Sequence, residues 1–256
     1  MPTFEFAGGP IFFWSNAPGG APAGPPLVLL HGAGGTHLHW PPLLRRATGF
    51  RVVAFDLPGH GKSGGAARES VEDYCALLAA WADAQGVERL IVGGHSLGAA
   101  IALGFALTHP QRTAGLVLAG ASARMAVSPA ILHGLRDDFA ATVELITQYS
   151  YGPGVEPERL EKHAAHLGAV GQTVLRADFA ACDAFDVRER VGEVRVPTLI
   201  LGAAQDKMTP SRRSEELHRA IAGSELHVLP DTGHMIPIEQ PDATTELIAA
   251  FVEKLA

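Results

Sequence analysis

The chain has 256 residues, of which 47% are hydrophobic, and its 20 basic and 27 acidic side chains give a formal net charge of −7. This length and composition suit a globular protein with one large domain or two small ones. The acidic balance, with the basic residues scattered along the chain, argues against a nucleic-acid partner.

The chain carries no signal for a membrane. No run approaches the roughly 18 uninterrupted apolar residues of a membrane span, and the first residues, MPTFEFAGGPIFFWSN, lack the pattern of a signal peptide. The two cysteines, Cys75 and Cys182, lie far apart in segments expected to be helical, which favours reduced thiols over a disulfide. We therefore expect a cytoplasmic protein without a membrane anchor.

The predicted elements begin with two short β-type runs, residues 3–7 and 11–15, which we expect to pair as a hairpin. Six more short runs follow, and each is apolar on both faces. Such runs are typical of a parallel sheet covered by helices, because a half-exposed strand would alternate polar and apolar residues. The six runs cover residues 27–30, 51–55, 89–94, 115–120, 197–202 and 225–230.

Helical patterns alternate with these runs. Ser70 or a neighbouring residue is suited to cap a helix that continues to about residue 84. Similar patterns cover residues 97–108, 211–221 and 241–255. This alternation predicts an α/β fold with one open, mostly parallel, doubly wound sheet.

Residues 124–190 break the alternation because they contain no convincing strand. We expect three or so helices there, forming a small helical cap inserted into a core of residues 1–123 and 191–256. An insertion at the carboxyl ends of parallel strands covers the place where such sheets bind ligands. The first apolar residues at helical spacing are Ile131, Leu135, Phe139, Val143 and Ile146.

The stretch LIVGGHSLGAA, residues 90–100, sets one serine among glycines where a strand gives way to a helix. In so sharp a turn, side chains at positions 94 and 98 would collide with their neighbours, so glycine is needed at both. The turn would push the Ser96 hydroxyl into the crevice and aim the N–H of Leu97 at a developing negative charge. Taken alone, the pattern Gly94-x-Ser96-x-Gly98 fits a simple helix N-cap equally well.

A serine hydroxyl becomes a good nucleophile only when a positioned base takes its proton. His234 lies in the loop after the last predicted strand, at the same sheet edge as Ser96. Asp206 follows the strand at residues 197–202, and we prefer it to Asp231 as the group that orients His234, because Asp231 would have to fold back along its own loop. The chain order Ser, Asp, His is that of one hydrolase architecture.

A tetrahedral intermediate also needs a second N–H donor. The small-residue loop His31-Gly32-Ala33-Gly34-Gly35 follows the first predicted parallel strand and can lie against a substrate without steric hindrance. We assign the donor to Ala33, with Gly34 as the alternative.

With these motifs in order, the chain resembles the α/β-hydrolase family over nearly its whole length. The resemblance implies the α/β-hydrolase fold with a helical cap, a Ser96, Asp206 and His234 triad, and oxyanion donors from Leu97 and Ala33. One departure is Ala99, where family members often have a second glycine. The segments that carry the resemblance are HGAGG, DLPGHGKS at 56–63, GHSLG at 94–98, LGAAQDKMTP and DTGHMIPIEQP.

Other signals are incomplete. Gly61-Lys62-Ser63 ends a P-loop pattern whose first glycine position holds Asp56. A dinucleotide fingerprint that starts at Gly32 fails because its third glycine position holds His37. The neighbouring histidines at 31, 37 and 39, and those at 163 and 166, have no further ligand at a sensible spacing, so we expect no metal.

We therefore expect a carboxylesterase-like serine hydrolase that cleaves esters of small or medium acyl groups through an acyl-enzyme on Ser96, with water as co-substrate and no cofactor. The same triad serves lactonases, thioesterases and C–C bond hydrolases, and a slow-turnover small-molecule receptor of this fold also stays open. The sequence does not define an oligomeric state. The expected pocket residues are Gly32, His37, Trp40, Phe139, Ile146 and Tyr149.

Overall fold

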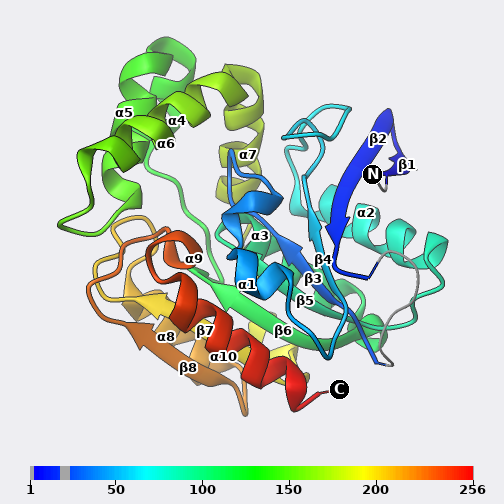
Figure 1. The fold of residues 1–256 in the computed structure, drawn as a ribbon. Helices are drawn as coiled ribbons and strands as arrows, with labels where there is room; N and C mark the ends of the chain where they lie inside the picture. The colour runs from blue at the N-terminus through cyan, green and yellow to red at the C-terminus, as the bar shows by residue number, and fades with distance from the viewer. Residues whose placement is uncertain (1–2, 18–23, 256) are drawn as a thin grey trace.

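An eight-stranded sheet runs through the part of the chain that the structure describes, and helices lie on both of its faces (Figure 1). The structure is a computed structural model that describes residues 3–17 and 24–255. The strand order is β1-β2-β4-β3-β5-β6-β7-β8, and only the pairs β1–β2 and β2–β4 are antiparallel. The predicted hairpin and the predicted open, mostly parallel sheet are both confirmed. The strands are β1 Thr3–Phe6, β2 Gly9–Ser15, β3 Leu27–Leu30, β4 Val52–Phe55, β5 Leu90–His95, β6 Thr113–Ala119, β7 Thr198–Ala203 and β8 Glu225–Leu229.

Helices of the core pack on both faces of the sheet. One face is covered by α2 (Val71–Ala84), α3 (Leu97–Thr108) and α8 (Ser211–Ala220). The other is covered by α1 (Pro42–Arg45), α9 (Ile236–Glu239) and α10 (Pro241–Glu253). The short 3-10 helices are η1 His37–His39, η2 Pro110–Arg112 and η3 Val191–Glu193.

The central strands β3 to β7 are mostly apolar because both of their faces are buried, whereas the edge strands β1 and β8 are partly exposed. In β3, Val28 and Leu30 join the hydrophobic core under α2 and α3, whereas Leu27 and Leu29 join the core under α1 and α10. Successive side chains of a strand point to opposite faces, so one strand supplies both cores. Helix α3 is buried along residues 97–107. An element buried in this way can hold the residue at its N-terminus in a fixed position.

The predicted N-cap of helix α2 is confirmed. The hydroxyl of Ser70 accepts the N–H of Asp73 at 3.2 Å. This bond satisfies one of the backbone donors that the first helical turn leaves free. Tyr74 and Trp81 lie on the buried face of the helix.

The insertion between β6 and β7 contains four α-helices, where the pattern predicted three or so. The apolar repeat from Ile131 to Ile146 is divided at Asp138, whose φ of −147° interrupts the helix. The Asp138 carboxylate then accepts the N–H of Ala141 at 3.3 Å and caps the next helix. The four helices are α4 Pro129–Asp137, α5 Phe139–Ser150, α6 Pro157–Val170 and α7 Gln172–Ala184.

The two ends of this insertion lie side by side. Arg124 and Asp186 form an antiparallel bridge, and the N–H of Val187 donates to the carbonyl of Ala123 at 2.8 Å. The chain therefore leaves the core and returns to it at one place, and α4 to α7 gather beyond one end of the sheet (Figure 1). We use the word cap for these four helices. Among the described residues, no helix has the length and apolar character needed to cross a membrane.

Candidate active site

Ser96 lies on the sharp turn between β5 and α3, with φ 53° and ψ −115°. A positive φ is uncommon for a residue with a side chain and is maintained only when the surrounding structure imposes it. A Cβ atom on Gly94 would overlap the carbonyl of Gly98, and one on Gly98 would overlap the carbonyl of Leu30. The two glycines are therefore needed for the close approach of three backbone segments, as the sequence pattern predicted.

His234 and Asp206 meet beside this turn. The Nδ1 atom of His234 lies 2.8 Å from Oδ2 of Asp206, and both side chains are buried. The other oxygen, Oδ1, accepts the N–H groups of Met208 at 2.8 Å and Thr209 at 2.7 Å. Because a carboxylate only accepts hydrogen bonds, Nδ1 carries the proton and Nε2 is left as the basic nitrogen.

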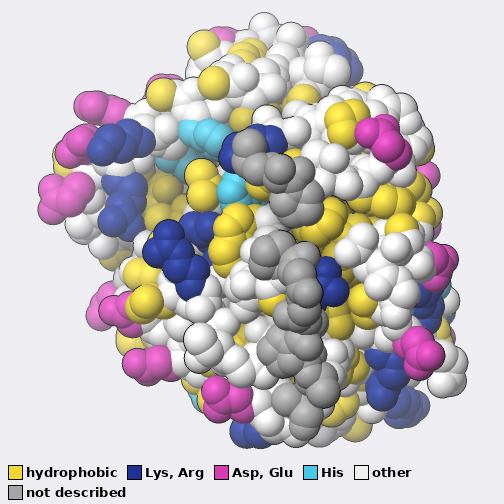
Figure 2. Space-filling view, turned by 45° about the vertical axis from the view of Figure 1, so that its right-hand side comes forward, with side chains coloured by type: hydrophobic (Ala, Val, Ile, Leu, Met, Phe, Trp, Pro, Cys, Tyr) yellow, Lys and Arg dark blue, Asp and Glu magenta, His cyan; other side chains and the backbone are white. Residues whose placement is uncertain are grey.

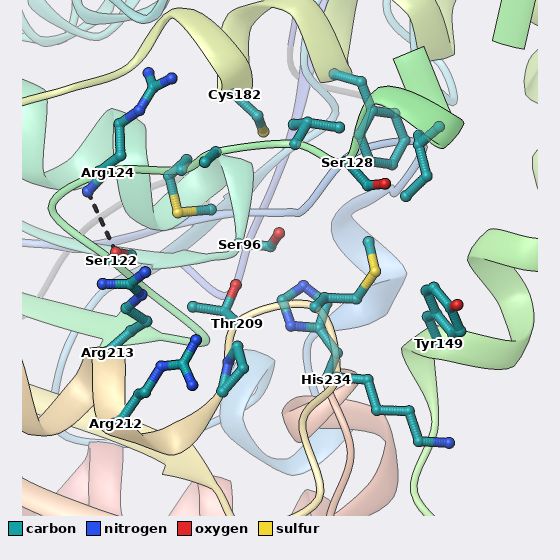
Figure 3. A pocket seen from close by; sticks show the side chains of 18 residues that line it. Ser96, Ser122, Arg124, Ser128, Tyr149, Cys182, Thr209, Arg212, Arg213 and His234 are labelled. Carbon is teal, nitrogen blue, oxygen red and sulfur yellow. Dashed lines mark hydrogen bonds between the residues drawn. The ribbon is translucent and has the colours of Figure 1, made fainter. Parts of the chain in front are cut away.

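Ser96 and His234 line the same cavity, and Figure 3 shows the imidazole of His234 beside the Ser96 hydroxyl. The alternative acid, Asp231, is exposed on a turn with φ 48°. The three residues that the sequence selected, Ser96, Asp206 and His234, are thus brought together from three separate loops. A hydroxyl, an imidazole and a carboxylate that orients the imidazole are the groups that acyl transfer uses.

His95 connects the turn to the His234 loop. Its Nε2 lies 2.7 Å from the carbonyl oxygen of His234. Burial lowers the pKa of His95 to about 3, so the ring is neutral at physiological pH and Nε2 carries the hydrogen that it donates. The hydrogen bond of His95 therefore supports the backbone of the His234 loop.

The predicted oxyanion loop packs against the turn. A Cβ atom on Gly32 would lie only 3.2 Å from the Cβ of Ser96. The N–H of Gly34 donates to Oδ2 of Asp178 at 2.8 Å, so Gly34 is not available as the alternative donor. In the described chain, the N–H groups of Ala33 and Leu97 donate to no protein acceptor. Ala33 and Leu97 therefore remain as the candidate pair.

Asp178 is a buried carboxylate that the sequence analysis missed. It lies on α7 of the cap and accepts hydrogen bonds from Gly34 and from Nε2 of His60, the latter at 2.9 Å. Burial lowers the pKa of His60, but the charge of Asp178 and its hydrogen bond outweigh burial and raise it overall. One signal was available in the sequence, since Asp178 falls between Leu175 and Cys182 on an otherwise apolar helix face.

A cavity of about 440 Å³ opens above Ser96, between the cap and the core (Figure 3). Its apolar wall includes Met125, Ile131 and Phe179. Of the predicted pocket residues, Tyr149 lines this cavity, whereas Gly32 and Ile146 line a smaller recess of about 40 Å³ that also reaches Ser96.

Three of the predicted pocket residues lie elsewhere, and these predictions were wrong. His37 is buried against Asp56, which accepts its backbone N–H at 2.7 Å and contacts its Nδ1 at 2.8 Å. Trp40 is fully buried in the core under α1 and α10. Phe139 faces a groove between α5 and α6 on the outside of the cap. Pairing with Asp56 decided the direction of His37, and burial of the aromatic ring decided that of Trp40.

The cavity also contains charged residues that the sequence analysis did not select. Its lining includes four basic side chains from two segments, one after β6 and one after β7. Their position was a usable signal, because ligands of open α/β sheets bind beyond the carboxyl ends of the strands. These residues are Arg124, Lys207, Arg212 and Arg213.

The sheet order and the three groups at its carboxyl edge define a class of α/β enzymes, and comparison with known proteins identifies the family. A family model described as "Alpha/beta hydrolase family" matches residues 27–247. The chain belongs to the alpha/beta hydrolase family, and several of its relatives have the names of hydrolases.

Individual relatives are similar over most of their length. The chain is 30% identical over 244 residues to a pimeloyl-[acyl-carrier protein] methyl ester esterase of Pectobacterium carotovorum, covering 89% of this chain and 94% of the relative. The solved structure of a thermophilic esterase matches with a TM-score of 0.85 and 28% identity, covering 100% of this chain and 98% of that one. The enol-lactonase of Burkholderia xenovorans LB400 has a TM-score of 0.88 at 22% identity, over 98% of this chain and 100% of that one, which shows a common fold.

Proposed function

We propose that this protein is a serine hydrolase that cleaves carboxylic esters of small or medium acyl groups through an acyl-enzyme on Ser96. One observation carries the proposal: the Ser96 hydroxyl, on a strained turn, shares a cavity with His234, whose Nδ1 is held by Asp206 at 2.8 Å. A serine that only capped a helix would need neither the strain nor the oriented base.

The first half of the reaction forms the acyl-enzyme. The Oγ of Ser96 attacks the ester carbonyl while Nε2 of His234 takes the hydroxyl proton, and Asp206 stabilises the imidazolium that results. The oxyanion accepts hydrogen bonds from the N–H groups of Leu97 and Ala33. The C–O bond to the alcohol then breaks, the electron pair leaves on the alcohol oxygen, and Nε2 returns the proton to it.

The second half repeats these steps with water. Nε2 of His234 takes a proton from water as the water oxygen attacks the acyl carbonyl. The same two N–H groups hold the second oxyanion. When it collapses, the bond to Oγ breaks, Ser96 recovers its proton from His234 and the carboxylic acid is released. The residues supply all proton transfers, so the mechanism requires no cofactor.

The cavity supports an ester of modest size. Its volume of about 440 Å³ is at the lower end of ordinary ligand pockets. Met125, Ile131 and Phe179 offer an apolar surface to an acyl chain. The names of two relatives, a methyl ester esterase and a thermophilic esterase, favour the same chemistry.

The test is steady-state hydrolysis of p-nitrophenyl esters from acetate to laurate by the parent protein and by Ser96→Ala. We expect turnover that peaks at a short or medium chain and that Ser96→Ala reduces by about 10⁴-fold or more. Ser70→Ala, which removes a hydroxyl at the start of α2 that does not line the cavity, is the matched control and keeps the activity.

Each other outcome points away from this proposal. Full activity in Ser96→Ala would refute it. A single burst of p-nitrophenol without turnover would support a slow receptor of the same fold instead. Turnover of a lactone or a thioester with none of a linear oxygen ester would assign the same triad to a different acyl substrate.

A further inference from the structure

Four cations surround the cavity above Ser96, although the chain as a whole is acidic, with a net charge of −7. The described residues that line the cavity include no Asp or Glu. By contrast, the face drawn in Figure 2 shows basic and acidic side chains interspersed. A cavity lined by charges of one sign concentrates its field and attracts a ligand of the opposite sign. The four residues are Arg124, Lys207, Arg212 and Arg213.

Two of the four cations already have carboxylate partners. Arg213 pairs with Glu216 at 2.8 Å. Arg124 donates to the carbonyl of Asp183 and lies 3.9 Å from the carboxylate of Asp186. For Arg212 and Lys207, no such partner is found in residues 3–17 and 24–255. The guanidinium group of Arg212, an exposed side chain at the mouth of the cavity, can therefore donate to a ligand.

The position of Arg212 is unfavourable for its own helix. Arg212 and Arg213 are the second and third residues of α8, whose first turn contains no acidic residue. The positive end of the helix dipole disfavours cations there. Arg213 is compensated by its pair with Glu216 on the same helix, but no such pair compensates Arg212 among the described residues, so helix stability does not explain Arg212. Figure 3 shows both side chains at the cavity, next to Thr209 and on the opposite side of His234 from Tyr149.

From this geometry we propose that the cavity is an anion subsite, in which Arg212 binds a carboxylate at the end of the substrate remote from the ester. The forked guanidinium of arginine matches a carboxylate with two parallel hydrogen bonds. The natural substrate would then be a half-ester of a dicarboxylic acid or an equivalent anionic ester. This inference rests on the proposed esterase function and adds the charge of the substrate to it.

The test compares pairs of p-nitrophenyl esters of equal length. One member is the half-ester of succinic, glutaric or adipic acid, and the other has its remote carboxylate capped as the amide. We expect kcat/KM for the best anionic ester to exceed that of its amide by about 10- to 100-fold, as a charged hydrogen-bonded pair requires. Arg212→Gln brings this ratio close to one, and added salt reduces it.

Arg219→Gln is the matched control, because Arg219 is an exposed arginine of the same helix that does not line the cavity. It keeps the preference for the anionic ester. The thermal unfolding midpoint of each variant verifies that it is folded. A ratio near one in the parent protein, or a ratio that Arg212→Gln does not change, would overturn the anion subsite while esterase activity on the amide stands.

A binding measurement keeps the inference testable if neither ester is cleaved. Ser96→Ala protein is titrated calorimetrically with glutarate, so that no turnover is needed. Binding that is lost in Ser96→Ala/Arg212→Gln and retained in Ser96→Ala/Arg219→Gln supports the anion subsite, even if the esterase proposal has failed. Absence of glutarate binding in Ser96→Ala would overturn it.

Discussion

Asp178 offers a sharp test of how the cap holds the proposed oxyanion loop, residues 31–35. The residue is on α7 of the cap and is fully buried. Its Oδ2 accepts hydrogen bonds from Gly34 at 2.8 Å and from His60 at 2.9 Å. Asp178→Asn keeps the shape of the side chain and removes the charge. The substitution thus separates the electrostatic contribution of Asp178 from its packing.

The expected loss of stability follows from the burial of both partners. Removing one partner of a buried ion pair typically costs about 3–5 kcal/mol, because the other charge is left without compensation. Asparagine can still accept the hydrogen bond from Gly34, and His60 can release its proton. We therefore expect Asp178→Asn to lower the free energy of unfolding by about 3 kcal/mol at pH near 6. The total free energy of unfolding of most domains is about 5–15 kcal/mol. The variant should therefore fold, with a loosened loop and a reduced kcat.

The pH dependence has a definite sign. Although burial lowers it, the pKa of His60 is raised overall by the charge of Asp178 and the hydrogen bond between them. A histidine with a raised folded-state pKa contributes its full stabilisation below its unfolded pKa of about 6.5 and loses it as the pH rises through the folded value. The difference in unfolding free energy between the parent protein and Asp178→Asn is therefore largest near pH 6 and smaller near about pH 9.

The assay is urea unfolding of both proteins at these two pH values, together with kcat on a short p-nitrophenyl ester at neutral pH. Asp137→Asn is the control, because Asp137 is an exposed cap residue that pairs only with its neighbour Arg136 among the described residues. It should leave both quantities unchanged. Equal stability of the parent protein and Asp178→Asn near pH 6, or a difference that grows with pH, would refute the reasoning.

Two further predictions concern glycine and cysteine. Gly98→Ala should cost about 2–3 kcal/mol in urea unfolding, because the added Cβ falls on the carbonyl of Leu30. Gly168→Ala should instead raise the free energy of unfolding by about 0.5–1 kcal/mol, since no neighbouring element has an atom within 4 Å of the Cβ added to this helical glycine. Similar effects of the two substitutions on stability would contradict this explanation. Burial raises the pKa of Cys75 to about 12 and also raises that of Cys182. Mass spectrometry should detect little alkylation of either thiol by iodoacetamide near pH 8 in the native protein and complete alkylation in urea; rapid native alkylation would contradict it.

The sequence alone determined the sheet and the group of residues around Ser96, because both depend on local rules. Runs apolar on both faces indicate parallel strands wherever they occur. Gly94 and Gly98 are required by the approach of backbone atoms within a few residues. Asp206 and His234 each follow a parallel strand, and the carboxyl ends of such strands meet at one edge, so their proximity follows from chain order.

Tertiary packing alone decided which way the other side chains point. His37 contacts Asp56, and Trp40 packs in the core. A buried partner stabilises the first side chain and apolar surroundings stabilise the second, more than the cavity would. Asp178 reaches Gly34 across 144 positions of the chain, a distance over which no periodic pattern carries information. The four basic residues of the cavity likewise lie together only because the fold brings the segments after β6 and after β7 to one cavity. Such long-range contacts depend on how whole helices and strands pack, which is a property of the fold and not of any local stretch of sequence.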